Sequence, residues 1–333
     1  MSIFTGLKML FDNHNRPIQY LRLAVTDRCN LRCQYCMPEE GIKYLPKQAL
    51  LSFEEIERLI AILAELGISK VRITGGEPFL RKDLMALLRS IRSIKGIRDL
   101  HLTTNGLLAV DHLEELTTLG IKSINLSMDT LDPIRFQRIT RRADFEKTWS
   151  AYQGFLQSGI PVKINCVVME GLNTEDILPM VELTRDSDTA VRFIEEMPFN
   201  GTGKRSEKLN WDHHKILEHI GQRYGAITHV EGQSSDTSKN YRIHGYKGTF
   251  GIIAAYSRTF CGTCNRIRVT AQGVLKTCLY DDGVLNIRDL IRSGCSDEQL
   301  RAELIQAFQS RPKDGFEAEA LRPVHASMST IGG

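Results

Sequence analysis

A predicted strand and three cysteines share the stretch Tyr20-Leu-Arg-Leu-Ala-Val-Thr-Asp-Arg-Cys29-Asn-Leu-Arg-Cys33-Gln-Tyr-Cys36. Its apolar first part, Tyr20–Val25, predicts a β-strand. The cysteines follow the spacing CxxxCxxC, and three thiolates this close together can bind one face of an iron–sulfur cubane. Three protein ligands for four irons leave one iron open to another ligand. A structural zinc ion normally takes four ligands from CxxC pairs, so zinc or a disulfide is the weaker interpretation.

Outward from this stretch, strand and helix patterns alternate up to about Tyr224. The predicted strands are Tyr20–Val25, Lys70–Thr74, Asp99–Thr103, Ser123–Met128, Val162–Val168 and Val191–Glu195. Six strands that alternate with helices favour a parallel sheet with helical crossovers. Periodicity alone allows an open doubly wound sheet or a barrel with fewer than eight units. In both, ligands gather at the carboxyl ends of the strands.

Local capping signals mark the ends of several helices. Ser52 and Glu55 form a capping box, and Gly67 ends that helix. Asp83 and Asp111 are predicted to open the next two. The helices after the first are predicted over Leu84–Ile94, His112–Leu119, Phe145–Ser158, Thr174–Thr184 and Trp211–Gln222.

The pattern changes after about Gly225, which predicts a division of the chain into residues 1–225 and 226–333. The later part is expected to contain short strands within Tyr241–Ala255. A hairpin is predicted from Arg266–Thr270 and Val274–Leu279, with its turn at Gln272-Gly273. Asn286 and Ser296 are predicted to cap helices over Ile287–Arg292 and Asp297–Ser310. The tail Arg311–Gly333 shows little regular patterning.

Composition narrows the class of protein. The 333 residues carry a formal net charge of +3, so a broad electropositive surface for nucleic acid is not expected. No run of 18 apolar residues predicts a membrane span, and Met1–Asn15 lacks the features of a secretory signal. A cytoplasmic location is therefore expected. In such a chain, grouped cysteines favour metal ligation over disulfides.

A second cysteine group lies in the C-terminal part of the chain. Cys261, Cys264 and Cys278 follow the spacing CxxC-x13-C, and the predicted hairpin lets all three converge. Cys295 could complete a four-cysteine zinc site, an alternative that spacing leaves open. Cys166 lies in an apolar strand and is expected in the core.

Two arginines follow the second cysteine group. Arg266 and Arg268 alternate along a predicted strand, so their side chains should lie on the same face. Two guanidinium groups on one face suit phosphate oxygens, which they can bind in a bidentate manner.

The first cysteine group resembles the signature of the radical S-adenosylmethionine (SAM) superfamily. Gly75-Gly76-Glu77-Pro78 resembles the GGEP motif of that superfamily, and Tyr35 resembles its aromatic residue beside the adenine. The resemblance implies a [4Fe–4S] cluster on Cys29, Cys33 and Cys36 whose open iron chelates SAM. Reductive cleavage of SAM would then yield a 5′-deoxyadenosyl radical.

More specifically, the chain is similar to the GTP 3′,8-cyclase family, also called molybdenum cofactor biosynthesis protein A. The stretches Leu21–Asn30 and Cys261–Thr270 resemble that family, as does the end Ser329-Thr-Ile-Gly332-Gly333. The resemblance implies an α/β fold, an incomplete (βα)6 TIM-like barrel with a C-terminal α+β cluster-binding extension. It also implies a second [4Fe–4S] cluster on Cys261, Cys264 and Cys278.

The family's site residues can be carried onto matching positions of this chain. The implied GTP contacts are Arg22, Arg72, Thr103, Lys163, Arg266 and Arg268. The implied SAM contacts are Tyr35, Gly76, Ser127 and Met197. Gly332 and Gly333, with Arg266 and Arg268, are the implied catalytic group. As ordinary alternatives, Arg22 and Arg72 could pair with carboxylates, Lys163 could face solvent, Met197 could fill the core and the glycines could be a disordered end.

The resemblance also implies a reaction and partners. The radical would remove the hydrogen at ribose C3′ of GTP, and the C3′ radical would attack guanine C8, giving 3′,8-cyclo-7,8-dihydro-GTP in the first step of molybdenum cofactor synthesis. A low-potential electron donor, a homodimer and hand-off to the downstream enzyme that forms cyclic pyranopterin are further expectations. Two alternatives remain: a peptide-modifying radical SAM enzyme with an auxiliary cluster, and a non-catalytic zinc-binding module.

Overall fold

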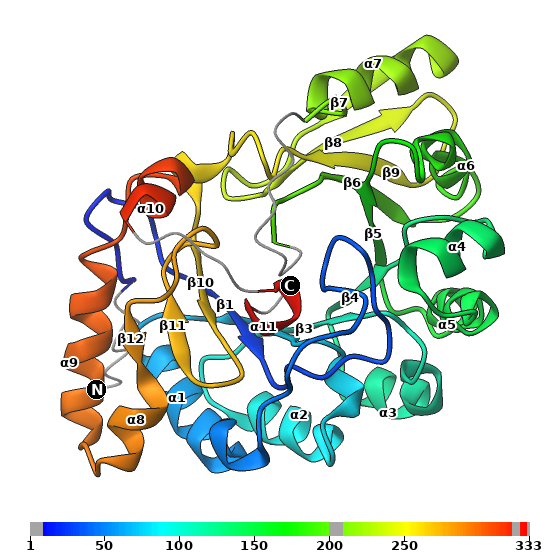
Figure 1. The fold of residues 1–333 in the computed structure, drawn as a ribbon. Coiled ribbons are helices and arrows are strands. Elements are labelled where there is room, and N and C mark those ends of the chain that lie inside the picture. Colours follow the sequence, from blue (N-terminus) through cyan, green and yellow to red (C-terminus); the bar gives the residue numbers. More distant parts are fainter. Residues whose placement is uncertain (1–8, 200–208, 322–326, 332–333) are drawn as a thin grey trace, which may run out of the picture.

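A single sheet of twelve strands organises the computed structural model, which describes residues 9–199, 209–321 and 327–331. The strand order is β12-β11-β10-β1-β2-β3-β4-β5-β6-β9-β8-β7. The sheet curves into an open ring with the larger helices outside it (Figure 1). This curvature creates an interior toward which one face of every central strand points.

The middle of the sheet is a run of six parallel strands in chain order. They are β1 (Tyr20–Ala24), β2 (Lys70–Thr74), β3 (Asp99–Thr104), β4 (Ser123–Ser127), β5 (Val162–Val168) and β6 (Ala190–Glu195). A doubly wound sheet would reverse its strand order at a switch point, and these strands show no reversal. The incomplete (βα)6 barrel is therefore confirmed, and it is not closed.

Helices connect these strands as expected, with a few differences. They are α1 (Phe53–Glu65), α2 (Leu84–Ser93), α3 (Leu113–Thr118), α4 (Pro133–Thr140), α5 (Phe145–Gln157), α6 (Ile177–Glu182) and α7 (His213–Tyr224), with 3₁₀ turns at Lys47–Ala49, Pro78–Leu80, Ala109–His112 and Thr174–Asp176. The capping box of Ser52 and Glu55 is confirmed. The prediction that Asp111 opens α3 is wrong, because Asp111 lies inside a 3₁₀ turn and His112 precedes the helix. Asp83 precedes α2, but its side chain makes no capping hydrogen bond.

The strands after residue 225 extend the same sheet at both edges. At one edge, β9 (Thr249–Ile253) runs parallel to β6, followed by antiparallel β8 (Ser238–Ile243) and β7 (Ile227–Val230). At the other, β10 (Arg266–Val269) runs parallel to β1, followed by antiparallel β11 (Val274–Lys276) and β12 (Leu285–Asn286). The hairpin predicted around Gln272-Gly273 is confirmed. The domain boundary at 225 stays a prediction.

Four helices complete the C-terminal part. They are α8 (Ile287–Arg292), α9 (Asp297–Phe308), α10 (Gly315–Leu321) and α11 (Met328–Ile331). Asn286 caps α8 and Ser296 caps α9, as predicted. The expectation of little regular structure in the tail is wrong for α10 and α11. Helix α11 lies in the middle of the ring (Figure 1).

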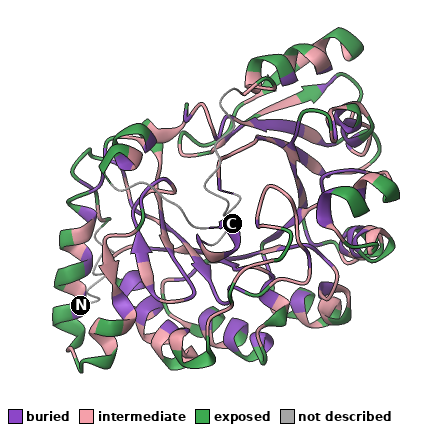
Figure 2. Cartoon of the chain, in the orientation of Figure 1, coloured by how far each residue is buried: buried purple, intermediate pink, exposed green. Residues whose placement is uncertain are grey.

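The central strands separate an apolar face from a polar face. On β1, Leu21 and Leu23 are fully buried in the main hydrophobic core, and Arg22 between them points the other way. Apolar side chains pack under the outer helices across the rest of the sheet. Figure 2 shows that many residues of the central strands are buried. Polar side chains are left to line the interior. In the described part of the chain, no helix combines the length and apolar character needed to cross a bilayer.

Candidate active site

The first cysteine group lies in the loop that leaves β1. Burial, and next the charge of Glu77, raises the pKa of Cys29 to about 11. Burial, and next the charge of Cys29, raises the pKa of Cys36 to about 12. Burial also raises the pKa of Cys33, and both other thiolates add to the effect. Three thiols that repel one another when ionised fit a shared cationic partner such as a cluster iron.

The Gly-Gly-Glu-Pro turn after β2 forms backbone hydrogen bonds with the segment that leads into this loop. Gly76 N donates to Thr26 O at 2.8 Å, and Glu77 N donates to Arg28 O at 2.7 Å. A Cβ at Gly76 would clash with the carbonyl of Arg28. Glycine is therefore required here because two backbone segments meet directly before Cys29. This is a different reason from the expected approach to SAM, and the SAM contact of Gly76 stays a prediction.

Asn105 is a neighbour of the first group that sequence reasoning missed. Its side-chain nitrogen donates to Asn30 Oδ1 at 2.7 Å and lies 3.9 Å from Cys29 Sγ. Glu77 fixes the turn by accepting from Asn105 N and Thr104 Oγ1, each at 2.8 Å. Asn105 is the first residue after β3, and this position at a strand's carboxyl end was the available signal.

Tyr35 and Ser127 lie on the same side of the barrel as the first group. The hydroxyl of Tyr35 hydrogen-bonds the carboxylate of Asp129, whose pKa burial raises to about 7. Asp129 also accepts from Val167 N at 2.8 Å. Ser127 is the last residue of β4 and pairs in register with Asn165 of β5. Their proposed SAM contacts stay predictions.

The second cysteine group lies between β9 and β12. Cys261 begins a 3₁₀ turn (Cys261–Thr263), Cys264 ends it and Cys278 follows β11. Burial raises the pKa of Cys278 to about 12, and the charges of Cys264 and Cys261 contribute, so the three thiols lie together. Burial would also raise the pKa of Cys264, but the charges of Arg266 and Arg311 outweigh it and lower that pKa.

The other two cysteines lie elsewhere. Cys295 is in the turn between α8 and α9, where it packs against the main core and its carbonyl accepts from Arg58. Cys166 is buried in β5, as predicted. Among the described residues, no three histidine, cysteine, aspartate or glutamate side chains converge on a point that one metal ion could occupy. In a cubane, by contrast, each thiolate binds a different iron.

Both cysteine groups border one small hydrophobic core. It consists of Phe199, Tyr280, Ala318, Met328 and Ile331, and Cys36, Cys278 and Met197 pack against it. Ser327 Oγ also donates to the carbonyl of Cys36 at 2.5 Å. One cysteine of each group therefore packs against the same small core, which includes Met328 and Ile331 of α11. Gly332 and Gly333 follow α11 directly, but they lie outside the described residues.

A cavity of about 410 Å³ opens beside the second group and extends into the barrel. Cys261, Cys264, Cys278 and Met197 contribute to its wall. Eleven arginines and lysines line it against three aspartates. The cations are Arg16, Arg22, Lys70, Arg72, Arg98, Lys163, Arg192, Arg258, Arg266, Arg268 and Arg311. Such an excess of positive charge over the lining carboxylates fits a polyanionic ligand.

Strand register explains why so many of these cations face one space. Arg268 pairs with Arg22, Arg22 with Arg72 and Arg72 with His101 across four neighbouring strands. Residues paired in register lie on the same face of a sheet. The polar face of the barrel therefore presents a row of three arginines that continues to the neutral His101.

The electrostatics of the cavity favour an anion. Burial, and next the charge of Arg268, lowers the pKa of Arg22 to about 9. Burial, and next the charge of Arg192, lowers the pKa of Lys163 to about 8. Burial would raise the pKa of Tyr20, but Arg72 and Arg22 outweigh it and lower that pKa to about 7. These shifts arise because like charges are held close together in a dry space, and bound phosphate groups would offset them.

Buried polar atoms in the cavity wall lack partners within the described structure. Among them are His101 Nε2, Asn125 Oδ1 and Asn165 Oδ1, from β3, β4 and β5. An unsatisfied buried polar atom costs about 1–3 kcal/mol, so these atoms suit contact with a polar ligand. Sequence reasoning missed them, together with Lys70 and Arg192. The sequence signal that could have found them is that they are polar residues alternating with apolar residues along a strand.

The structure brings most of the predicted GTP contacts together, whereas Tyr35, Gly76 and Ser127 of the predicted SAM contacts are not part of the same cavity wall. The cavity is lined by Arg22, Arg72, Lys163, Arg266 and Arg268 of the predicted GTP contacts and by Met197 of the predicted SAM contacts. Thr103 lies on β3 with its buried hydroxyl unpartnered in the described structure, and it is not part of the cavity wall. Its role and those of the other site residues stay predictions.

Comparison with known proteins identifies the family. Residues 23–184 match the model of the radical SAM superfamily, and residues 189–317 match that named Molybdenum Cofactor Synthesis C. The partial barrel with its CxxxCxxC loop is therefore that of a radical SAM enzyme. The chain is 41% identical to the mitochondrial GTP 3′,8-cyclase of Arabidopsis thaliana, covering 98% of this chain and 84% of that protein. It is 39% identical to the GTP 3′,8-cyclase of Thermodesulfovibrio yellowstonii, covering 97% and 99%. The chain belongs to the GTP 3′,8-cyclase family.

A solved structure supports the fold. Streptococcus suis SuiB bound to S-adenosylmethionine superimposes with a TM-score of 0.61 at 17% identity, covering 93% of this chain and 69% of that chain. As a member of its family, the chain uses SAM and two [4Fe–4S] clusters. Two separate triplets of half-buried cysteines fit that requirement, since each can bind three irons of one cluster.

Proposed function

We propose that this chain converts GTP to (8S)-3′,8-cyclo-7,8-dihydroguanosine 5′-triphosphate, the first step of molybdenum cofactor synthesis. The observation that carries the proposal is the cationic cavity with the second cysteine group in its wall. A triphosphate needs many cations, and a nucleotide base needs a polar surface with free hydrogen-bonding groups. The cavity provides both, and the family relatives carry the name of this reaction.

Each cysteine group has a separate task in this proposal. Cys29, Cys33 and Cys36 would hold the cluster that, with bound SAM, supplies a 5′-deoxyadenosyl radical for attack at ribose C3′. Cys261, Cys264 and Cys278 would hold the second cluster beside the nucleotide. Tyr35, Gly76, Ser127 and Met197 are proposed to bind SAM.

The cationic side chains would bind and orient the nucleotide. Arg266 and Arg268 on β10 and Arg22 on β1 carry guanidinium groups that suit bidentate contacts with phosphate oxygens. Arg72, Thr103 and Lys163 complete the proposed GTP contacts. Anchoring the triphosphate holds the ribose in one place and so restricts the radical to one hydrogen. Gly332 and Gly333 are proposed to enter the site from α11, where a backbone without side chains can approach closely.

The partners of the enzyme are also proposals. The chain would receive electrons from a low-potential donor and pass its product to the downstream enzyme that forms cyclic pyranopterin. We further propose a cytoplasmic location and a homodimer.

An anaerobic assay tests the proposed reaction. Protein with reconstituted clusters is mixed with SAM, dithionite and one nucleoside triphosphate, and 5′-deoxyadenosine is measured. GTP should stimulate its formation strongly, and GTP deuterated at C3′ should transfer deuterium into it. Equal stimulation by ATP, or deuterium transfer from another position, would contradict the proposal.

Lys163 should make GTP binding depend on pH. Its pKa of about 8 in the ligand-free protein means that it loses its proton as the pH rises past 8. A triphosphate favours the charged form, so binding above pH 8 must take up a proton and weakens by up to about tenfold per pH unit. In Lys163→Arg the decline between pH 7.5 and 9 should become shallower, because arginine stays protonated. Binding is measured by anaerobic calorimetry, with exposed Lys239→Arg as the control. A profile unchanged by Lys163→Arg would exclude this role.

A further inference from the structure

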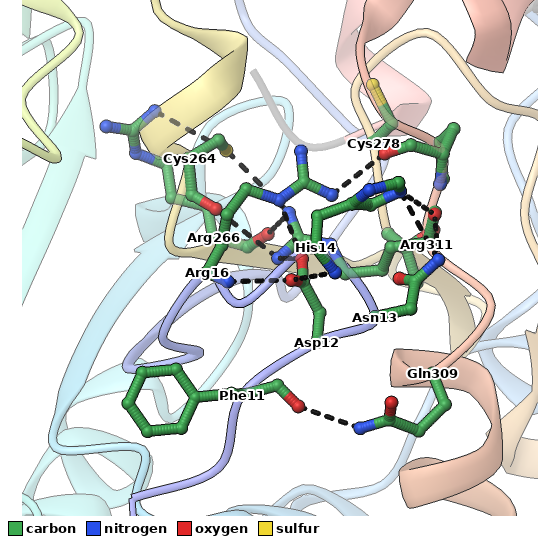
Figure 3. A network of polar contacts seen from close by, with 12 residues as sticks. Phe11, Asp12, Asn13, His14, Arg16, Cys264, Arg266, Cys278, Gln309 and Arg311 are labelled. Carbon is green, nitrogen blue, oxygen red and sulfur yellow. Dashed lines mark hydrogen bonds and ion pairs between the residues drawn. The ribbon is translucent and has the colours of Figure 1, made fainter.

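A buried carboxylate near the N-terminus connects two arginines that are far apart in the sequence. Asp12 Oδ2 accepts from Arg16 Nε at 2.7 Å and lies 3.1 Å from Arg311 Nη1 (Figure 3). The side chains of Asp12, Arg16 and Arg311 are exposed by at most 5%. Burial would raise the pKa of Asp12, but hydrogen bonds from Arg16 and the charge of Arg311 lower it. Asp12 is therefore the anion of a buried ionic network.

Arg16 carries this network to the first half of the second cysteine loop. Its Nη1 donates to the carbonyl of Cys261 at 3.1 Å and to that of Lys313 at 2.8 Å. Its Nη2 donates to the carbonyl of Pro312 at 2.8 Å. One guanidinium thus joins the cysteine loop to the segment before α10.

Arg311 carries the network to the second half of the same loop. Its Nη2 donates to Arg266 O at 3.0 Å and lies 3.8 Å from Cys264 Sγ. Its Nη1 donates to Cys264 O at 3.3 Å. Arg311 thus contacts both Asp12 and Cys264, and Arg266 Nη1 lies 4.0 Å from the same thiol (Figure 3).

We propose that Asp12, Arg16 and Arg311 form a clamp that positions Cys261 and Cys264 for the second cluster and Arg266 for the substrate. All three are positioning residues in this proposal. Both ends of the CxxC loop are held by guanidinium groups that share one carboxylate, so the loop's shape depends on that single charge. The inference rests on the family's second cluster but not on the cyclisation of GTP.

The energetic reason is the cost of buried charge. Without the carboxylate of Asp12, the buried guanidinium groups of Arg16 and Arg311 lose the anion that they share. Breaking a buried ion pair in this way is strongly destabilising. The arginines would then move, and their hydrogen bonds to the carbonyls of Cys261, Cys264 and Arg266 would weaken. Arg311 also donates toward Cys264 Sγ, and hydrogen bonds to cluster sulfurs raise the reduction potential.

The test compares Asp12→Asn and Arg311→Gln with wild type after anaerobic reconstitution. Both variants should bind about four irons per chain instead of about eight, because only the second cluster is lost or labile. Any second cluster retained in Arg311→Gln should have a lower midpoint potential. Dithionite-driven SAM cleavage without GTP should persist, since it depends on the first group. Iron content and potential do not depend on the nucleotide, so the clamp can fail while the proposed function stands.

Glu55→Gln is the matched control. Glu55 is a half-buried carboxylate that accepts from Arg292 across α1 and α8, away from both cysteine groups. Glutamine preserves its capping-box role, so this variant should keep about eight irons. A full complement of iron with an unchanged potential in both clamp variants would overturn the proposal. Loss of both clusters together, or loss of the fold, in both variants would overturn the proposal as well. Either result would mean that the network stabilises the whole protein and does not specifically position the second cysteine loop.

Discussion

Replacing Arg266 and Arg268 together by alanine should lower the affinity for GTP by about 100-fold or more. Each guanidinium can donate hydrogen bonds to a charged phosphate group, worth about 1.5–3 kcal/mol apiece. Both arginines line the cavity from β10, and Arg268 pairs in register with Arg22. GTP-dependent formation of 5′-deoxyadenosine should therefore be lost at ordinary substrate concentrations. Anaerobic calorimetry measures the affinity directly.

Two controls make this result specific. Arg89 and Arg301 are partly exposed arginines that pair with Glu115 and Glu65 on outer helices. Replacing both by alanine removes the same net charge and should leave the affinity for GTP unchanged. Because Arg266 approaches Cys264 Sγ, the iron content of the cavity variant is measured first. Unchanged affinity in a variant with both clusters would refute the assignment of the phosphate site.

Replacing Cys29, Cys33 and Cys36 by serine should reduce SAM cleavage to background. Serine oxygens are poor ligands for the irons of a cluster, which prefer thiolates. The variant should retain about four irons on the second group and should still bind GTP. Iron analysis, 5′-deoxyadenosine formation and nucleotide calorimetry report the three properties separately.

Cys295→Ser is the control for this experiment. Cys295 packs against the main core away from the second group, so its replacement should leave about eight irons in place. Loss of the second metal centre in Cys295→Ser would instead support the alternative interpretation, a zinc site with four cysteine ligands. Substantial SAM cleavage by the triple variant would instead remove the first group from the reaction.

The regular part of the fold was predictable because its signals are local. Strand β5 alternates apolar and polar residues, and the capping box of Ser52 and Glu55 marks the start of α1. Helix α4 was missed because its pattern is short, although Pro133 follows the capping residue Asp132. Helices α10 and α11 are also short and are stabilised by packing against the site.

The candidate site was predictable where residues stand beside a motif. Arg266 and Arg268 follow Cys264 directly, and their common face follows from strand periodicity. Lys70 and Arg192 were missed because a lone cation on a strand does not reveal which other strands face it. Their role became visible only when the curved sheet placed them around one cavity.

Periodicity and spacing along the chain were enough to predict the six βα units, the two thiol triplets and the arginine pair, because these signals involve only a few neighbouring residues. The tertiary structure was needed to show that the second thiol triplet and the arginine pair line one cavity, and that Asp12 lies between two arginines that contact the second cysteine loop. Arg16 and Pro312 are separated by 296 positions, yet their hydrogen bond is 2.8 Å long. Such contacts depend on how the whole sheet curves and on which segments lie beside its edge strands. No local sequence pattern encodes that arrangement.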